Sequence, residues 1–344
     1  MRALRSAAAL AGAIASVGAI ASVGAIALAG TVGLAWIASP AQAYTVYVSN
    51  EKGNSLTVID SDTLQVLTTI PVGQRPRGIM LSKDDKTVLI CASDSNTVQV
   101  LDVATRQIVA KLPSGPDPEL LNIHPSGSPI YVANEDDNLL TVIDLNTKDA
   151  IAEVEVGVEP EGVGVSPDGK TVVVTSETTN MAHFIDTETY EITDNVLVGT
   201  RPRFAEFTAD GSQLWVSSEV AGTVSVIDAK TREIIKIIEF NVPGVQQIYI
   251  QPVGVRVNKE GTKAFVALGP ANRVAVIDAK TFEVEDYLLV GKRVWQLAFT
   301  PDQKLLFATN GNSNDVSVID VPSLKVTKSI PTGTAPWGVT ISKE

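Results

Sequence analysis

Residues 55–60 read Ser-Leu-Thr-Val-Ile-Asp, and the Val-Ile-Asp ending, or a close variant of it, returns six more times along the chain. The aspartates that end these copies are 42 residues apart, except for one spacing of 50 residues. They are Asp60, Asp102, Asp144, Asp186, Asp228, Asp278 and Asp320. Seven copies in register at this period indicate a repeat protein, in which each copy is one supersecondary unit.

Other residues keep the same register. Glycine follows the aspartate by 13 residues in six copies, and proline follows it by 16 residues in five. Each unit contains four short stretches of strand-forming residues, separated by turns such as Pro167-Asp168-Gly169. Four strands per unit of this length are typical of a propeller blade. We therefore predict an all-β fold, a seven-bladed β-propeller of four-stranded blades, over residues 44–344.

The two ends of this region carry complementary parts of one blade. The first predicted strand, residues 44–49, corresponds to the second strand of a unit, and the last, residues 337–342, corresponds to a first strand. We expect these two strands to pair in one blade, because ring closure removes the exposed strand edges of an open sheet.

The N-terminal 43 residues have the features of an export signal. Arg2 and Arg5 precede an uncharged stretch over residues 7–40, and Ala41-Gln42-Ala43 is a typical cleavage motif. We predict a cleavable secretory signal peptide over residues 1–43 and a periplasmic location. The alternative is an uncleaved anchor, since about 20 apolar residues suffice to cross a bilayer. A strand directly after the cleavage motif favours cleavage, so we expect no stable membrane anchor.

Composition limits the classes of partner and of site. The formal net charge is −12, and loss of residues 1–43 with their two arginines makes it −14, which disfavours nucleic acid as a partner. Cys91 is the single cysteine, so disulfides and cysteine-rich metal sites are excluded. His124 and His183 fall at turn and strand positions that other residues occupy in the other copies, and we assign both a structural role. We expect the protein to be a monomer.

One register position varies while the rest of the unit repeats. The residue 17 positions after each aspartate opens the strand expected to line the central channel. Allowing for eight inserted residues in one copy, the seven residues are Arg77, Glu119, Glu161, Arg203, Val253, Trp295 and Trp337. A repeat protein that varies at one surface places its specificity there. With neighbouring loop arginines, we predict a ligand- or partner-binding site on this funnel face, formed by Arg75, Arg77, Glu119, Glu161, Arg201, Arg203, Trp295 and Trp337. The alternative is charge neutralisation around a solvated pore.

The eight extra residues fall within the segment Asn-Val-Pro-Gly-Val-Gln-Gln-Ile-Tyr-Ile, residues 241–250, which we expect on the same face. Its apolar content favours a lid or a partner-binding loop. A neutral insertion is the alternative, since surface loops tolerate added length at little cost.

Several stretches resemble known propellers. Tyr131-Val132-Ala133-Asn134 resembles the YVTN-type repeat of secreted bacterial and archaeal propellers. Residues 73–78 (GQRPRG), 176–184 (SETTNMAHF) and 201–207 (RPRFAEF) resemble the β-propeller proteins associated with catabolism that depends on pyrroloquinoline quinone (PQQ). This resemblance implies a periplasmic protein associated with PQQ-dependent alcohol oxidation, with a quinoprotein dehydrogenase system as the source of its partner. It supplies no biochemical activity. The dehydrogenases themselves have eight blades, so the chain is not expected to be one of them.

Three functions follow from these observations. The favoured one is an accessory or binding propeller that holds a partner protein or an anionic small ligand. PQQ fits that ligand class, because arginines bind carboxylates and tryptophans stack on flat rings. The second is a metal-dependent hydrolase or lyase at the channel mouth, with Glu119, Glu161, Glu177 and Asp136 as candidate ligands. The third is a general protein-interaction scaffold. A binding role is favoured over an enzymatic one, and no catalytic or metal residue is assigned.

Overall fold

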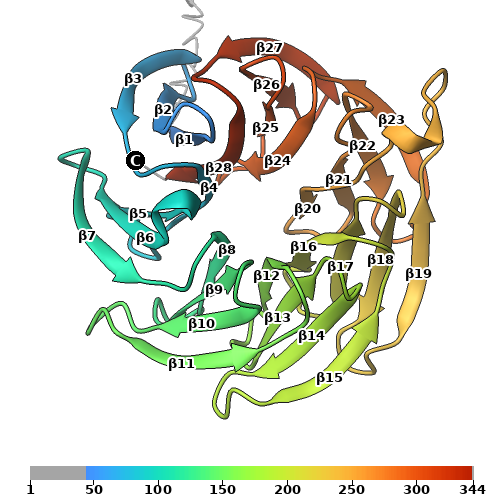
Figure 1. Ribbon diagram of the computed structural model, residues 1–344. Coiled ribbons are helices and arrows are strands. Elements are labelled where there is room, and N and C mark those ends of the chain that lie inside the picture. The colour runs from blue at the N-terminus through green and yellow to red at the C-terminus, as the bar shows by residue number, and fades with distance from the viewer. Residues whose placement is uncertain (1–43, 343–344) are drawn as a thin grey trace, which may run out of the picture. The chain divides into compact units, whose positions relative to one another are not determined.

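The computed structural model describes residues 44–342, so the predicted signal peptide lies outside the described residues. Residues 44–342 form seven four-stranded antiparallel sheets, arranged as blades in a ring (Figure 1). The predicted all-β, seven-bladed propeller is confirmed. Two one-turn 3₁₀ helices, η1 (Ser93–Ser95) and η2 (Gln247–Tyr249), complete the regular structure of this region. Within residues 44–342, no helix has the length and apolar character needed to cross a bilayer.

Each blade contributes one strand to each of four concentric positions. The innermost strands are β4 (Pro76–Leu81), β8 (Pro118–Ile123), β12 (Pro160–Val165), β16 (Pro202–Phe207), β20 (Val255–Val257), β24 (Val294–Phe299) and β28 (Pro336–Ser342). The second strands are β5 (Thr87–Ala92), β9 (Ile130–Asn134), β13 (Thr171–Ser176), β17 (Gln213–Ser218), β21 (Lys263–Ala267), β25 (Leu305–Asn310) and β1 (Thr45–Asn50). The third strands are β6 (Thr97–Asp102), β10 (Leu139–Ile143), β14 (Met181–Asp186), β18 (Thr223–Asp228), β22 (Arg273–Asp278), β26 (Asp315–Asp320) and β2 (Ser55–Asp60). The outer strands are β7 (Gln107–Pro113), β11 (Ala150–Glu155), β15 (Ile192–Leu197), β19 (Ile234–Glu239), β23 (Val284–Leu289), β27 (Lys325–Pro331) and β3 (Gln65–Pro71).

The Val-Ile-Asp motif ends the third strand, and each of its residues has a separate task. Successive side chains of a strand point to opposite faces of the sheet. Val58 accordingly packs in the core shared with the blade of β4–β7, and Ile59 packs in the core shared with the blade of β24–β27. Asp60 then closes the turn, because its Oδ1 accepts hydrogen bonds from the Asp62 and Thr63 backbone N–H groups at 3.0 and 2.7 Å.

Seven apolar cores hold the described blades together, one at each junction between neighbours. At one junction, Tyr131 and Val142 pack against Val163 and Val174 of the next blade. Both faces of a blade are therefore buried, and this explains why second strands such as β5 carry an unbroken run of apolar residues.

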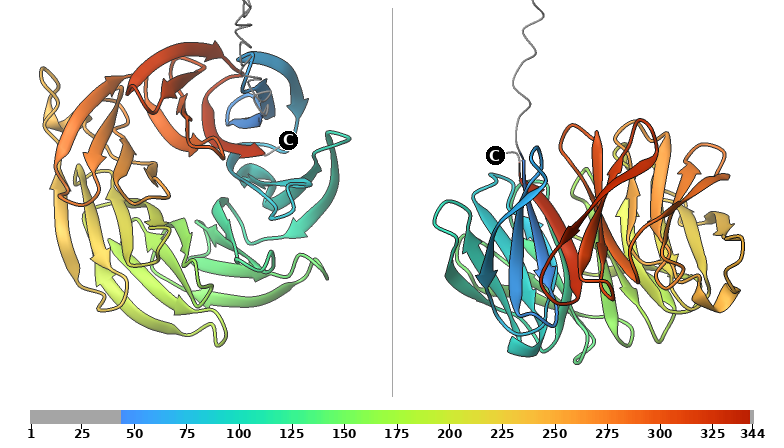
Figure 2. Two further views of the ribbon diagram at one scale, coloured as in Figure 1. Left: turned by 180° about the vertical axis from the view of Figure 1, so that it is seen from behind. Right: turned by 90° about the horizontal axis from the view of Figure 1, so that it is seen from above.

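The two ends of the described chain meet in one blade. Strand β28 pairs antiparallel with β1, with Thr45 opposite Ser342 and Val48 opposite Val339. Figure 2 shows β28, in red, beside β1, in blue. The predicted closure of the ring is confirmed, with β28 as the innermost strand of that blade.

His183 is part of this framework. Its Nε2 accepts the backbone N–H of Gly157 at 3.0 Å, as the Gln99 side chain accepts that of Gly73 at 2.8 Å in another blade. The histidine thus occupies a position that orders a loop between blades.

Candidate functional site

The inner strands run from one end of the channel to the other, which defines two faces. The loop face carries the connections from each outer strand to the next inner strand, together with the connections from second to third strands. The turn face carries the tight turns after the inner strands. All eight residues predicted to form the funnel site lie at the loop face, at or just before the start of an inner strand.

A repeated loop geometry positions the predicted arginines. In six of the seven inter-blade loops of residues 44–342, the residue before the inner-strand proline position has a left-handed backbone, as Arg75 (φ 50°) and Arg201 (φ 60°) do. This conformation is unfavourable for a residue with a side chain, by about 1 kcal/mol or more. A loop asparagine stabilises it, since Asn54 Oδ1 accepts the Arg75 N–H at 2.9 Å and Asn180 Oδ1 accepts the Arg201 N–H at 3.0 Å.

The residues at the variable register position form a largely buried layer and not the open wall of a funnel. Glu119 and Trp337 are fully excluded from solvent, and Glu161, Arg203 and Arg77 are at most 8% exposed. Of the eight predicted site residues, Arg75, Arg201 and Trp295 retain partial or greater exposure. Charged groups at this depth need partners, because a buried unpaired charge is strongly destabilising.

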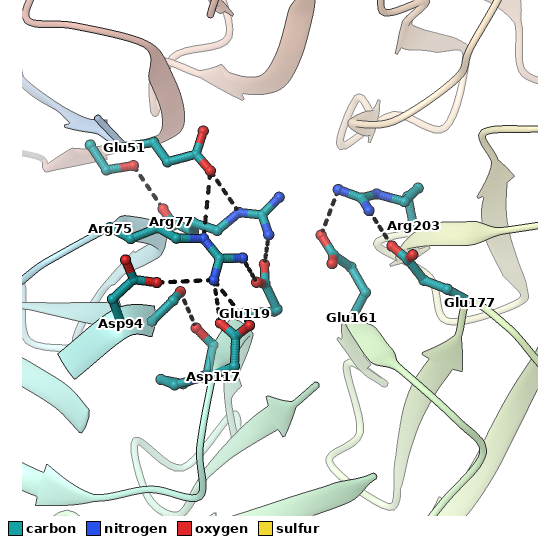
Figure 3. A network of polar contacts seen from close by, with 12 residues as sticks. Glu51, Arg75, Arg77, Asp94, Asp117, Glu119, Glu161, Glu177 and Arg203 are labelled. Carbon is teal, nitrogen blue, oxygen red and sulfur yellow. Dashed lines mark hydrogen bonds and ion pairs between the residues drawn. The ribbon is translucent and has the colours of Figure 1, made fainter. Parts of the chain in front are cut away.

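The first group of partners surrounds Glu119, on strand β8. Arg77 Nη1 lies 2.5 Å from Glu119 Oε2, and Arg75 Nη2 donates to Glu119 Oε1 at 2.7 Å. Arg75 Nη1 also donates to Asp117 Oδ1 at 2.8 Å, while Glu51 Oε1 lies 3.7 Å from the Nε atoms of both arginines. Figure 3 shows this group, with Arg77 and Arg75 enclosed by carboxylates from three blades.

The second group surrounds Arg203, on strand β16. Arg203 Nη2 lies 3.1 Å from Glu161 Oε1, and its Nη1 donates to Glu177 Oε1 (Figure 3). Arg201 Nε donates to the other oxygen of Glu177 at 2.6 Å. Arg293 Nη2 donates to Glu219 Oε1 at 3.0 Å and extends the group towards the sixth inner strand, β24. All five arginines of the two groups are therefore engaged by carboxylates of the protein.

The two tryptophans pack beside these groups. The Arg77 guanidinium lies 4.7 Å from the centre of the Trp337 ring, and the Arg293 guanidinium lies 4.4 Å from that of Trp295. The two indole rings are 6.4 Å apart. Gly311 makes room for Trp295, because a Cβ atom there would lie 2.4 Å from Trp295 Nε1. The arginines thus stack on tryptophans as well as pairing with carboxylates.

Sequence reasoning missed three acidic members of this face, namely Glu51, Glu135 and Glu219. They occupy the position nine residues before a Val-Ile-Asp aspartate, as Glu177 does. The backbone explains the placement, because the Glu219 N–H donates to the Arg201 carbonyl at 2.8 Å and brings the two side chains together. Aligning this second register position would have found them.

Burial changes the acidity of the carboxyl groups. Burial raises the pKa of Glu119 well above its usual value, against the opposing charge of Arg77. Burial and the nearby charge of Glu161 raise the pKa of Glu177 to about 7, although Arg203 and Arg201 act in the opposite direction. Burial and Glu161 also raise the pKa of Glu135. Glu177 therefore titrates near neutral pH.

The metal alternative finds partial support in the geometry. Among the described residues, Asp117, Glu119 and Glu135 each bring an oxygen within 4.8 Å of the others. Of the four candidate ligands, only Glu119 is in this group, and Arg75 and Arg77 already pair with it. Glu161 and Glu177 pair with Arg203, and Asp136 is exposed. An acidic group neutralised by arginines has little charge left for a cation.

The inserted segment is partly core and partly surface. Val242 and Ile250 are buried in the core between its two flanking blades, and Val245 packs against that core. Between these anchors, the η2 turn exposes Ile248 by 70% and Tyr249 by 52%. Gly222, in the neighbouring loop, accommodates the segment, since a Cβ there would lie 3.1 Å from the Ile250 carbonyl oxygen.

An exposed apolar patch results beside the ion-paired layer. Val220, 61% exposed, follows Glu219 in the loop that carries Gly222. We name Val220, Ile248 and Tyr249 the insertion patch. Gln251 connects it to the charged layer, because its amide nitrogen donates to the Ile248 carbonyl and its amide oxygen accepts from Arg293, both at 3.1 Å.

Comparison with protein families supports a β-propeller family. The model of the cytochrome D1 haem domain matches residues 89–204, and the model of YNCE-like β-propellers matches residues 24–121. Neither match spans half of the chain. No curated protein matches it.

Solved structures share the fold at low sequence identity. Hydrazine synthase from Kuenenia stuttgartiensis is similar with a TM-score of 0.74 and 22% identity, over 80% of this chain and 92% of that one. A functionally unknown protein from Desulfotomaculum acetoxidans has a TM-score of 0.71 and 18% identity, over 87% and 98% of the two chains. The dihydro-haem d1 dehydrogenase NirN has a TM-score of 0.66 and 16% identity, over 86% and 74%. These similarities establish the fold alone.

Haem is not a natural ligand of the residues at the loop face. Both histidines of the chain already have hydrogen-bond partners: His183 Nε2 accepts the Gly157 backbone N–H, and His124 Nδ1 lies 2.6 Å from Ser126 Oγ in a turn of the opposite face. PQQ finds no better fit in this layer, because each arginine that would bind its carboxylates is already paired with a carboxylate of the protein.

Proposed function

We propose that the protein is a non-enzymatic binding propeller of the periplasm, which docks a protein partner of a PQQ-dependent alcohol oxidation system on its loop face. The stretches that resemble PQQ-associated propellers support the biological setting. The observation that carries the binding role is the insertion patch, an apolar surface held out from a rigid core.

The charged layer favours a protein partner over a small anion. A tricarboxylate would have to displace carboxylates that are already bonded to Arg75, Arg77, Arg201 and Arg203, and it would leave those carboxylates buried and unpaired. A protein partner needs no such displacement, because it contacts the rim. The layer then acts as a rigid, neutralised base beneath the docking surface.

The insertion patch has the character of an interface centre. Exposed apolar side chains that cluster on one face mark interaction sites, and tyrosine is enriched among the residues that dominate binding. Polar groups flank the patch, namely the exposed Gln246 and Gln247, which directly precede Ile248. An apolar centre with a polar rim is the usual arrangement of a protein–protein interface.

The proposal can be tested by site-specific crosslinking in cells. A photoreactive phenylalanine derivative at position 249 is expected to form a covalent adduct with a quinoprotein dehydrogenase, or with a subunit of its system, in the periplasmic fraction. The same residue at position 109 serves as the control, because Val109 is also exposed and apolar but lies on the outer strand β7. Adducts of the same protein at both positions, or none at position 249, would count against the proposal.

A further inference from the structure

A hollow opens at the turn face, at the opposite end of the channel from the proposed docking surface. It has a volume of about 410 Å³ and is lined by apolar side chains such as Ile79, Phe207 and Phe299 and by polar ones such as Glu206, Arg256 and Lys259. A narrower lobe of about 60 Å³ continues from it towards Gln296 and Trp337. Small-molecule sites in proteins are concave, mostly apolar and typically of about 300–1,000 Å³.

Small residues on the inner strands create this space. Near the turn-face ends of the inner strands, one register position holds Ala298 and Thr340 where other blades hold larger residues such as Met80, and both small residues line the hollow. Above the hollow, Arg77, Glu119, Glu161, Arg203 and Trp337 are buried, so the hollow is a cup with its base at the ion-paired layer. A ligand would therefore enter from the turn face.

The charges in the cup favour a monoanion. Arg256 and Lys259 contribute two positive charges to its lining, and Glu206 contributes one negative charge. Arg256 Nη1 lies 3.2 Å from Glu206 Oε2, and its guanidinium is 4.7 Å from the centre of the Phe204 ring. Burial raises the pKa of Glu206, against the charge of Arg256, so this carboxyl group gives up its charge more readily than an exposed one.

The narrow lobe contains an unsatisfied amide. Gln296 is 4% exposed, and neither its Nε2 nor its Oε1 has a hydrogen-bond partner among the described residues. Gly254 leaves space for it, because a Cβ there would lie 2.9 Å from Gln296 Oε1. Buried polar groups are nearly always hydrogen-bonded, so an amide with both atoms free indicates a missing partner that can both donate and accept.

We propose that the turn-face cup binds a small monocarboxylic acid whose apolar body carries a hydroxyl group. The carboxylate would pair with Arg256, the apolar body would contact the strand-end side chains, and the hydroxyl group would donate to Gln296 Oε1 and accept from its Nε2. This site is independent of the loop-face docking surface, since the buried ion-paired layer separates the two.

Calorimetric titration of the mature protein with 6-hydroxyhexanoate tests the proposal. We expect saturable binding, with hexanoate and 1,6-hexanediol each about tenfold weaker because each lacks one of the two polar anchors. Arg256→Met should remove the preference for the acid over the diol. Gln296→Leu should remove the preference for the hydroxy acid over hexanoate, and it is structurally conservative because Leu120 occupies the same register position of another blade.

Two further variants complete the design. Thr340→Phe fills the cup and should abolish binding, whereas Tyr249→Ser, on the other face, should leave the affinity unchanged. Circular dichroism shows whether each variant is folded. If Thr340→Phe does not fold, the ligand preferences of Arg256→Met and Gln296→Leu still test the proposal. Absence of heat with 6-hydroxyhexanoate, or affinities that neither Arg256→Met nor Gln296→Leu changes, would overturn the proposal.

Discussion

Arg77 and Glu119 form a buried ion pair between neighbouring blades, with Arg77 Nη1 2.5 Å from Glu119 Oε2. Each residue is the second of the inner strand of its own blade, so the pair joins the starts of β4 and β8. Arg203 and Glu161 repeat the arrangement between β16 and β12 at 3.1 Å. The charged residues expected to bind a ligand are thus ion-paired with one another.

Replacing Glu119 should cost the fold much of its stability. Glu119→Gln leaves Arg77 buried without its closest counter-charge, and loss of one partner of a buried pair costs about 3 kcal/mol or more. Guanidinium chloride unfolding measures the change. The control is Glu155→Gln, an exposed carboxyl group on the outer strand β11. Equal stability of the two variants would contradict a structural role for the layer.

The pKa of Glu177 predicts a pH dependence of stability. Its folded-state value of about 7 lies above the usual value of 4.5, so the folded protein binds a proton that the unfolded chain releases. The stability contributed by the protonated group is fully present below about pH 4.5 and is lost as the pH rises to about 7. Wild-type stability should therefore fall relative to Glu177→Gln across this window. A constant difference between the two proteins would refute the assignment.

Removal of β28 should unfold the whole described domain. Deleting residues 336–344 exposes the edge of β1 and removes the fully buried Trp337 from the core. We expect loss of the cooperative thermal transition, because both ends of the ring depend on this strand. Deletion of residues 343 and 344 alone serves as the control. A cooperative transition in the longer deletion would show that the ring does not need its closing strand.

Substitutions of the exposed residues of the inserted segment should leave stability almost unchanged, whereas substitutions of its buried residues should lower it. Ile250→Ala removes a fully buried side chain and should destabilise the protein by about 3 kcal/mol. Ile248→Ala, at a position 70% exposed, should change stability by less than about 0.5 kcal/mol. Chemical denaturation distinguishes the two, and similar losses at both positions would mean that the tip is packed and unavailable for docking.

The repeat made the fold predictable because one local pattern recurs in every blade. The Val-Ile-Asp motif specifies the blade in two ways. Its two apolar side chains pack against opposite neighbouring blades, and its aspartate closes the following turn. The variable position 17 residues after each aspartate identified the ion-paired layer for the same reason, because equivalent positions of the repeat lie at the same level of the channel.

Pairing and empty space were not predictable in this way. Glu51 and Glu219 were missed because their position also holds serine or glycine in other copies, such as Ser93 and Gly311, which obscures the acidic pattern. Whether Arg77 faces solvent or a carboxylate depends on the blade beside it. The turn-face cup is a volume left over by small residues on separate strands, and no single stretch of sequence contains it.

Equilibrium binding to a purified PQQ-dependent alcohol dehydrogenase from the same cells tests the central claim most directly. The wild-type protein is expected to bind it, measured by sedimentation velocity, and the double variant Ile248→Ser/Tyr249→Ser should bind at least about tenfold more weakly while keeping its melting temperature. Val109→Ser, on an outer strand, should bind as the wild type does. Equal affinities of all three proteins, or no complex with the wild type, would contradict docking at the insertion patch.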